Sequence, residues 1–256
     1  SAAPTVLAPD TAVQLRQGVA PERVVSVGDP EMRVGHKSER VRWAGYKAHL
    51  SVETGAEFIT GVTVTDANAY DGDQALPILC QQQAVGLCPE ALVGDRAYSK
   101  AEARLAVAEA GSELVARVPP AAARAGCFSK DAFALALDDP AGPALTCPAG
   151  IATREVRPHS RGQVFVFPSG TCAACALRAR CTTRAPEAMR RQATGRTVFL
   201  HPLEAVLQRA RAAAATPRGQ ALLRRRAVVE RRLAHLMRTG LRQARYVGRA
   251  KVEAQA

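Results

Sequence analysis

The segment that decides the fold is ALVGDRAYSKAEARLAVAEAGSELVARVP, residues 91–119. Its first run, 91–95, is too short and too apolar for a surface helix and is typical of a buried parallel strand. Residues 99–111 have the spacing of an amphipathic helix that ends at Gly111. A second short strand is expected over 113–119. Strand, helix and strand in this order predict an α/β fold.

Two further strands precede this segment. The stretch GYKAHLSVE (45–53) alternates between apolar and polar residues, which indicates a half-buried strand. His49 falls on its polar face, where we expect it to be solvated or hydrogen-bonded without a catalytic role. The stretch FITGVTVT (58–65) is rich in β-branched residues and is expected to be the second arm of an antiparallel pair.

The composition divides the chain into four expected regions. Residues 1–25 are rich in Ala and Pro and are interpreted as a linker, and residues 26–119 are expected to form an α/β core. Residues 120–200 carry Pro, Gly and Cys with little periodicity, which indicates an insertion. Residues 201–256 are basic and helical, and we expect them to complete the core. The sequence does not begin with Met, so we expect a fragment of a longer protein.

Positive charge is concentrated in the second half of the chain. Residues 1–130 hold 13 Lys or Arg and 15 Asp or Glu, whereas residues 131–256 hold 22 and 8. Within 203–251 there are 13 basic residues and two acids, Glu204 and Glu230. A segment of this kind is typical of a surface that binds nucleic acid. The alternative is a solvated Arg-rich face. No apolar run has the length of a membrane span.

Asp95 stands at the end of the apolar run of the deciding segment. An aspartate in this position is either a helix cap or a metal ligand. The following helix is expected to begin nearer Ser99, which favours the metal ligand. The carboxyl ends of strands in α/β sheets are also favoured positions for functional sites.

Glu230 is the best partner for Asp95. At helical spacing it shares a stripe with Leu223, Arg226, Ala234 and Met237, so we expect it to face inward. One interpretation is an internal ion pair between Arg226 and Glu230, four residues apart. The other is a carboxylate that holds a metal ion beside a phosphate backbone.

The seven cysteines indicate reduced thiols, because their number is odd and no secretion signal is visible. Cys172 and Cys175 have CxxC spacing, Cys181 follows closely, and Cys147 lies upstream. Four thiolates at such positions can form a structural zinc site. The alternative is free thiols in a loop.

Taken together, these pieces resemble bacterial insertion-sequence transposases with a ribonuclease H-like DDE domain. The motifs that carry the resemblance are DPEMR (29–33), GYKAHLSVE (45–53), ITGVTVTDANAYD (59–71), VGDRAYS (93–99), CPAG (147–150), the Cys172/Cys175/Cys181 cluster and RRRAVVERRLAHL (224–236). The resemblance implies a ribonuclease H-like mixed sheet flanked by helices. The Cys-rich insertion would precede the last catalytic helix.

The resemblance also implies the site residues. The second catalytic Asp of the family falls on Asp95 and its Glu on Glu230. The first Asp is expected upstream of this sequence, with Asp29 as the alternative. Of the residues that often surround the family's Glu, the Arg matches as Arg226. The Tyr and Lys positions depart from the pattern, since Leu223 and Met237 stand there, with Arg238 next to the latter.

The implied activity is metal-dependent strand cleavage and strand transfer on DNA. Asp95 and Glu230 would hold Mg²⁺ or Mn²⁺, while Arg226, Arg231 and Arg238 would bind DNA. The implied partner is double-stranded DNA at transposon ends and target, with two copies of the chain on it. The implied location is the bacterial cytoplasm, on the nucleoid when bound to DNA. The alternatives are a non-catalytic zinc-containing DNA-binding protein and an inactive transposase remnant.

Overall fold

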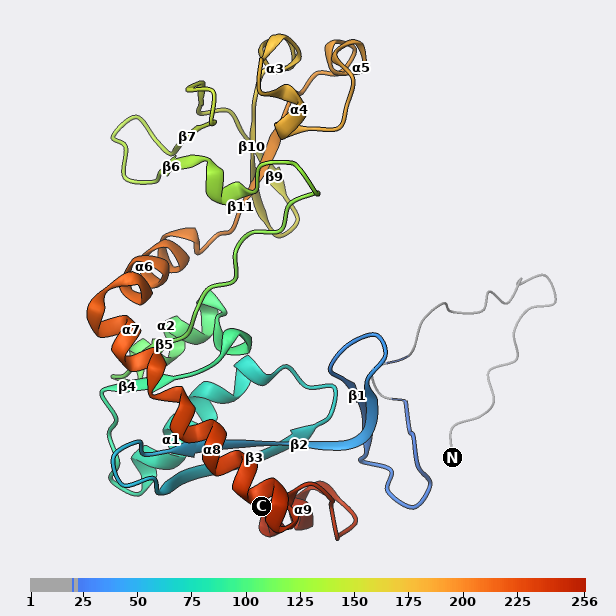
Figure 1. The fold of residues 1–256 in the computed structure, drawn as a ribbon, viewed down its shortest axis with the longest axis vertical. Helices are drawn as coiled ribbons and strands as arrows, with labels where there is room; N and C mark the ends of the chain where they lie inside the picture. Colours follow the sequence, from blue (N-terminus) through green and yellow to red (C-terminus); the bar gives the residue numbers. More distant parts are fainter. Residues whose placement is uncertain (1–19, 21–22) are drawn as a thin grey trace, which may run out of the picture. The chain divides into compact units, whose positions relative to one another are not determined.

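The structure is a computed structural model that describes residue 20 and residues 23–256. The expected linker over 1–25 therefore lies almost entirely outside the described residues. The described chain divides into two compact units, whose helices and strands are labelled in Figure 1. The first combines the described residues up to His49 with Val64–Ala69 and Gly240–Ala256. The second contains Leu50–Thr63 and Tyr70–Thr239.

The first sheet begins in the first unit and has the strand order β1-β2-β3. Its strands are β1 (Arg33–His36), β2 (Arg42–Val52) and β3 (Ile59–Asp66). β1 pairs with β2 in antiparallel register. The strands β2 and β3 confirm the two that the alternating and β-branched patterns predicted.

Of the two states expected for His49, solvated or hydrogen-bonded, the structure shows the hydrogen-bonded one. Its side chain is buried, with 6% of its surface exposed. The ring Nε2 lies 2.9 Å from the Oγ1 of Thr65 on β3. Because a buried polar group that has a hydrogen-bond partner costs little, the polar face of β2 tolerates burial at this position.

The deciding segment folds as predicted, in the second unit. Its strands β4 (Ala91–Val93) and β5 (Glu113–Val115) are parallel neighbours, joined by helix α2 (Ala101–Glu109). Helix α1 (Ala75–Ala84) packs against α2. Leu79 and Val107 are fully buried between these elements, together with Ala75 and Leu114. Gly111 ends the helix as expected, with a φ of 85° that favours glycine.

One charged residue of α2 is directed into this core. Arg104 is buried, and its guanidinium donates to the carbonyl oxygens of Leu114 and Ala116 at 2.6 and 2.5 Å. Burial lowers the pKa of Arg104, against the smaller opposite effect of Glu113. The guanidinium therefore satisfies carbonyl groups at the end of β5 that would otherwise lack donors.

Residues 120–200 are more regular than their sequence indicates. Their strands are β6 (Ala134–Ala136), β7 (Ala144–Thr146), β8 (Ala152–Thr153), β9 (Val156–His159), β10 (Gly162–Val166) and β11 (Thr197–Leu200). Their helices are α3 (Ser169–Ala174), α4 (Arg178–Cys181) and α5 (Pro186–Arg190). They surround a core that includes Phe133, Leu145, Phe165 and Phe167. Periodicity missed this core because strands of two to five residues are too short to show it.

The basic C-terminal helices begin with α6 (Glu204–Ala215) and α7 (Pro217–Arg224). They separate at Thr216, because the Thr216 hydroxyl accepts from the Gly219 N–H at 3.1 Å and Pro217 starts α7. Glu204 is buried, with 2% of its surface exposed, and pairs with Lys130 and Arg211. This buried acid joins α6 to Lys130 in the Cys-rich residues 120–200.

The mixed α/β class is therefore confirmed. In the described part of the chain the strands lie in four sheets of two or three strands, whereas the sequence predicted one mixed sheet. None of the helices in the described residues has the length and apolar character needed to cross a bilayer.

The aromatic core of residues 120–200 gives a first prediction. Phe165→Ala removes a ring that is 1% exposed and is expected to lower the free energy of unfolding by about 3–5 kcal/mol. The control is Phe58→Ala, since Phe58 is 70% exposed and its truncation should cost less than about 0.5 kcal/mol. Urea unfolding followed by circular dichroism measures both. Equal midpoints for the two variants would contradict this account of the core.

Candidate functional site

Asp95 is positioned by the turn that follows β4. It precedes the short 3₁₀ helix η2 (Arg96–Tyr98), and its Oδ1 accepts a hydrogen bond from the Ala97 N–H at 2.8 Å. Asp95 is therefore a helix cap through one carboxylate oxygen. The expected helix start near Ser99 had favoured the metal ligand instead. The residue is exposed, so the cap does not remove the carboxylate from solvent.

Two glycines make this turn tight. A Cβ on Gly94 would lie 2.8 Å from the Cβ of Tyr98 and equally close to its ring, so only glycine lets the tyrosine fold back over the strand end. A Cβ on Gly72 would lie 2.3 Å from the Ala97 carbonyl oxygen. The 3₁₀ helix η1 (Asp71–Gln74), which contains Gly72, therefore packs directly against the turn of Asp95.

This packing brings a second carboxylate toward Asp95. Burial raises the pKa of Tyr98 strongly, and the negative charges of Asp71 and Asp95 raise it further. Asp71 lies on η1, which contacts η2, so both carboxylates act electrostatically on the Tyr98 hydroxyl. No side chain caps η1 or the helix α1 that follows it. The sequence signal for this contact was the glycine that follows Asp71, because glycine permits a close approach of another backbone segment.

Glu230 lies on helix α8 (Arg226–Leu236) and does not face inward as predicted. Its side chain is 64% exposed and pairs with Arg226 one turn earlier. Leu223 is buried, but it belongs to α7, and no residue of α8 is buried. The predicted stripe fails because none of the α8 residues on it is buried, although Arg225 between α7 and α8 keeps helical φ and ψ.

The turn between β2 and β3 holds α8 in place. Glu57 in this turn pairs with Arg231 at 2.9 Å and with Arg232 at 3.0 Å. Two of the predicted DNA-binding residues, Arg226 and Arg231, are thus engaged with acids of the protein itself. The third, Arg238, is exposed in the π-helical turn Met237–Leu241 that follows α8.

The structure does not by itself assemble the predicted metal centre. Within residues 20 and 23–256, no three or more His, Cys, Asp or Glu side chains form a group that could hold a metal ion. Asp95 and Glu230 are both exposed oxygen donors of the type that Mg²⁺ and Mn²⁺ bind. Their role as a metal-binding pair stays a prediction.

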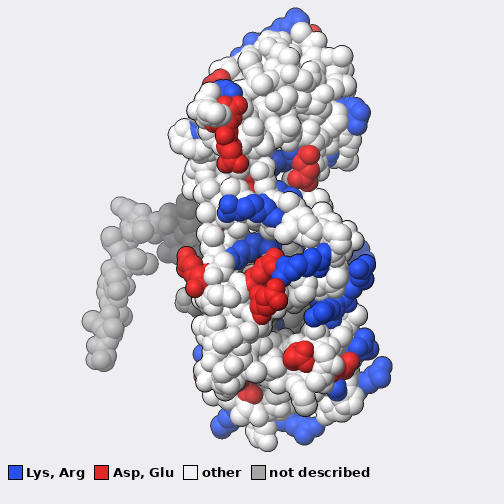
Figure 2. Space-filling view, turned by 90° about the vertical axis from the view of Figure 1, so that its left-hand side faces the viewer, with Lys and Arg blue, Asp and Glu red and all other residues white. Residues whose placement is uncertain are grey.

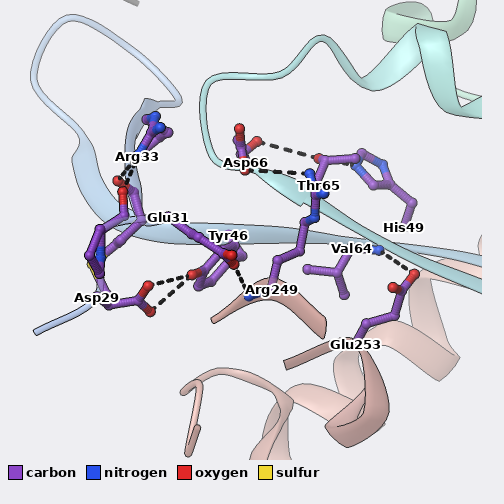
Figure 3. A network of polar contacts seen from close by, with 12 residues as sticks. Asp29, Glu31, Arg33, Tyr46, His49, Val64, Thr65, Asp66, Arg249 and Glu253 are labelled. Atoms are coloured by element: carbon purple, nitrogen blue, oxygen red, sulfur yellow. Dashed lines mark hydrogen bonds and ion pairs between the residues drawn. The ribbon is translucent and has the colours of Figure 1, made fainter. Parts of the chain in front are cut away.

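Asp29, the alternative first carboxylate, has a different role in the first unit (Figure 3). It is 5% exposed, and the Tyr46 hydroxyl lies 2.8 and 2.9 Å from its two oxygens. The Gly248 N–H donates to its Oδ2 at 3.2 Å. A buried carboxylate whose two oxygens already accept hydrogen bonds is a structural anchor and is poorly suited to open metal coordination.

The neighbouring acids complete this anchor. Glu31 accepts from the Arg249 N–H at 2.6 Å, and Glu253 accepts from the Val64 N–H on β3 at 3.2 Å (Figure 3). The Nη1 of Arg249 lies 3.9 Å from the Oδ1 of Asp66. The DPEMR motif and the edge of β3 together hold helix α9 (Arg249–Gln255) in the first unit.

The four cysteines with zinc-like spacing line a single cavity of about 30 Å³. All seven cysteines of the chain are free thiols. Burial raises the pKa of the Cys172 and Cys181 thiols, and the neighbouring Cys147 and Cys175 add to this effect. The structure therefore brings together the four thiols that the sequence selected.

Basic charge on the surface is partly balanced by acids. On the face shown in Figure 2, Lys and Arg side chains stand in several groups, and some of these adjoin Asp or Glu. Arg218 illustrates this, since it pairs with Glu90 at 2.7 Å and with Glu113 at 2.6 Å. Exposed pairs of this kind contribute little to stability and are easily exchanged for other anions.

The C-terminal part of the chain also matches a known protein family. Residues 146–256 match the family model described as a transposase DDE domain. This part of the chain is identified as transposase DDE domain sequence. The match confirms the resemblance for the C-terminal part and includes Glu230, α8 and the four clustered cysteines. Asp95 lies outside it. The chain has no significant match to a curated protein or to a solved structure.

The Asp29 anchor of this transposase-like chain gives a second prediction. Burial alone would raise the pKa of Asp29, but the hydrogen bonds from Tyr46 and from the backbone of Gly248, Glu31 and Met32 outweigh it, and the pKa is lowered. Tyr46→Phe removes one donor from the ionised carboxylate. It should lower the free energy of unfolding by about 1–3 kcal/mol at pH 7.

The pH dependence of this effect follows from the lowered pKa. A carboxyl with a lowered pKa contributes stability above its ordinary value near 3.8, and this contribution is lost as the pH falls through the folded value. The difference between the wild type and Tyr46→Phe should therefore be full at pH 7 and shrink below about pH 4. Urea unfolding at both pH values measures it. Tyr246→Phe, at an exposed tyrosine, is the control and should unfold like the wild type.

Proposed function

We propose that the chain is the C-terminal catalytic part of a DDE transposase, which performs metal-dependent strand cleavage and strand transfer on double-stranded DNA. The observation that carries the proposal is the transposase DDE match over residues 146–256, which contains Glu230 on a helix dense in arginine. The turn of Asp95 supplies the second acid of the proposed site. The fold would be ribonuclease H-like.

Asp95 and Glu230 are the residues proposed to hold Mg²⁺ or Mn²⁺. When bound, such ions activate the attacking oxygen and stabilise the leaving oxygen of an in-line displacement at phosphorus. The protein's part is to present the carboxylates. The capping hydrogen bond from Ala97 fixes the orientation of Asp95, and Gly94 and Gly72 keep its turn from shifting.

The ion pair between Arg226 and Glu230 on α8 would link DNA binding to the release of Glu230 for a metal ion. An exposed pair four residues apart on a helix is worth about 0.3–0.5 kcal/mol, so a metal ion and a phosphate together can replace it. Glu230 would then turn to the metal ion, while Arg226 would bind the DNA backbone. Arg231 can exchange Glu57 for a phosphate in the same way, and Arg238 is exposed for a third contact.

The metal-binding role is tested with Mn²⁺. We expect the wild type to bind Mn²⁺ in the presence of DNA, and Asp95→Asn and Glu230→Gln each to lose this binding, as measured by electron paramagnetic resonance. Any cleavage of supercoiled plasmid should fall at least about a hundredfold, because the metal supplies several kcal/mol. The control is Glu109→Gln, an exposed carboxylate on α2. Unchanged Mn²⁺ binding in both site variants would reject the proposed site.

The DNA contact is tested separately. Arg226→Ala, Arg231→Ala and Arg238→Ala should each weaken binding to double-stranded DNA, and each should reduce the slope of log affinity against log salt by about one. The control is Arg154→Ala, which removes an arginine that is paired with an acid, Asp139 at 2.8 Å, like those of α8 but lies outside the basic C-terminal helices. A salt slope unchanged in all three would exclude this helix as the DNA-binding surface.

The second candidate is a non-catalytic DNA-binding protein. The observation that favours it is the exposed pairing of Glu230 with Arg226, which needs no metal. The two experiments separate the candidates. Salt-dependent DNA binding without Mn²⁺ binding would support this second function, whereas Mn²⁺ binding that depends on Asp95 and Glu230 supports the transposase.

A further inference from the structure

Four thiols of the Cys-rich region come together from separate short elements. Cys147 follows β7, Cys172 lies in α3, Cys175 follows α3, and Cys181 ends α4. All four line the same cavity. The remaining cysteines of the chain do not line it. The cysteines that line the cavity are therefore the same four whose spacing resembles a zinc site.

Tight backbone turns direct two of these thiols. The Cys147 carbonyl accepts from the Gly150 N–H at 2.8 Å, and the Cys147 N–H donates to the Ile151 carbonyl at 2.9 Å. Gly150 has a φ of 80°, which this turn requires and which other residues adopt at a cost. A second turn follows α3, where the Cys175 N–H lies 3.4 Å from the Cys172 carbonyl oxygen. Both turns place a cysteine at the start of a short reversal of the chain.

The backbone also approaches one sulfur closely. The Arg196 N–H donates to the Sγ of Cys172 at 3.5 Å. A Cβ on Gly195 would lie 2.7 Å from this sulfur, so only glycine permits the approach. A backbone N–H directed at sulfur stabilises the thiolate form, and such outer contacts orient metal-binding ligands. This contact is independent of the cysteine spacing.

We propose that Cys147, Cys172, Cys175 and Cys181 together bind one structural Zn²⁺ ion. A four-thiolate set suits zinc in tetrahedral coordination. The cavity of about 30 Å³ exceeds the roughly 10–15 Å³ that one water-sized body needs. The four thiols do not form a coordination group in this structure, so binding of the ion requires their side chains to move closer together.

The ion would tie together elements that are too short to be stable alone. Helices α3 and α4 have six and four residues, far below the length at which a helix persists by itself. Zinc would join them to the turn that follows β7. The site holds for either function proposed above, because it depends on residues outside the Asp95 and Glu230 pair.

The competing account treats the thiols as ordinary core residues. Three of them pack against the cluster of Phe133, Phe165 and Phe167, where neutral thiols are acceptable. The two accounts differ in metal content. Zinc binding predicts one equivalent of metal and protection of four thiols, whereas the core account predicts neither.

The test measures zinc in protein purified under reducing conditions without a chelator. We expect about one zinc per chain by elemental analysis. This zinc should be lost in Cys147→Ser and in Cys175→Ser. The matched controls are Cys80→Ser and Cys88→Ser, at exposed cysteines outside the cavity, which should keep it.

A second measurement uses the wild type alone, so that a variant that fails to fold cannot decide the outcome. A thiol-reactive dye should label three cysteines in native protein and seven after a strong chelator is added. Replacement with Co²⁺ should give the absorption of tetrahedral thiolate coordination. Protein without zinc that also fails to take up added Zn²⁺, or equal zinc in wild type and both site variants, would overturn the proposal.

Discussion

The close packing at the end of β4 is the constraint on which the proposed catalytic site depends. Burial of Leu79 and Val107 fixes α1 and α2 against the parallel pair β4 and β5. On that base, Gly94 lets the Tyr98 ring fold back, and Gly72 lets η1 contact the same turn. Asp95 is thereby exposed at a strand end with its orientation set by a hydrogen bond to the backbone. Enlarging either glycine would displace the carboxylate without touching it.

The positive charge of the basic helix α8 is partly balanced by weak ion pairs with acids. Arginines of α8 are abundant, but several of them are paired with acids on the protein surface. Each such pair is weak because both partners remain in contact with water. A polyanion that brings many phosphates can replace these acids one by one, so pairing in the free protein is compatible with DNA binding. The buried acids Asp29 and Glu204 behave differently, because loss of a partner would leave a buried charge without compensation.

The strands and helices of the core were largely predictable. The apolar run that becomes β4, the helix that ends at Gly111 and the alternating residues of β2 all carry local signals of period or turn chemistry. Asp95 was selected by its place after a strand, and the four cysteines by their spacing. The inward orientation of Glu230 was wrong, because spacing on a helix does not tell which face is covered, and no residue of α8 is buried. The burial of His49 and the core around Phe165 also had no local signal.

The sequence by itself determined which chemical groups are present and which lie on strands, helices and turns. It determined the basic C-terminal helices, the acid after β4 and the set of four thiols, because local spacing records these directly. Only the tertiary structure decided which groups meet. It placed Asp71 near Tyr98, both oxygens of Asp29 against Tyr46, and four thiols on one cavity. These contacts join residues that are distant along the chain, and they arise from packing that no local pattern encodes.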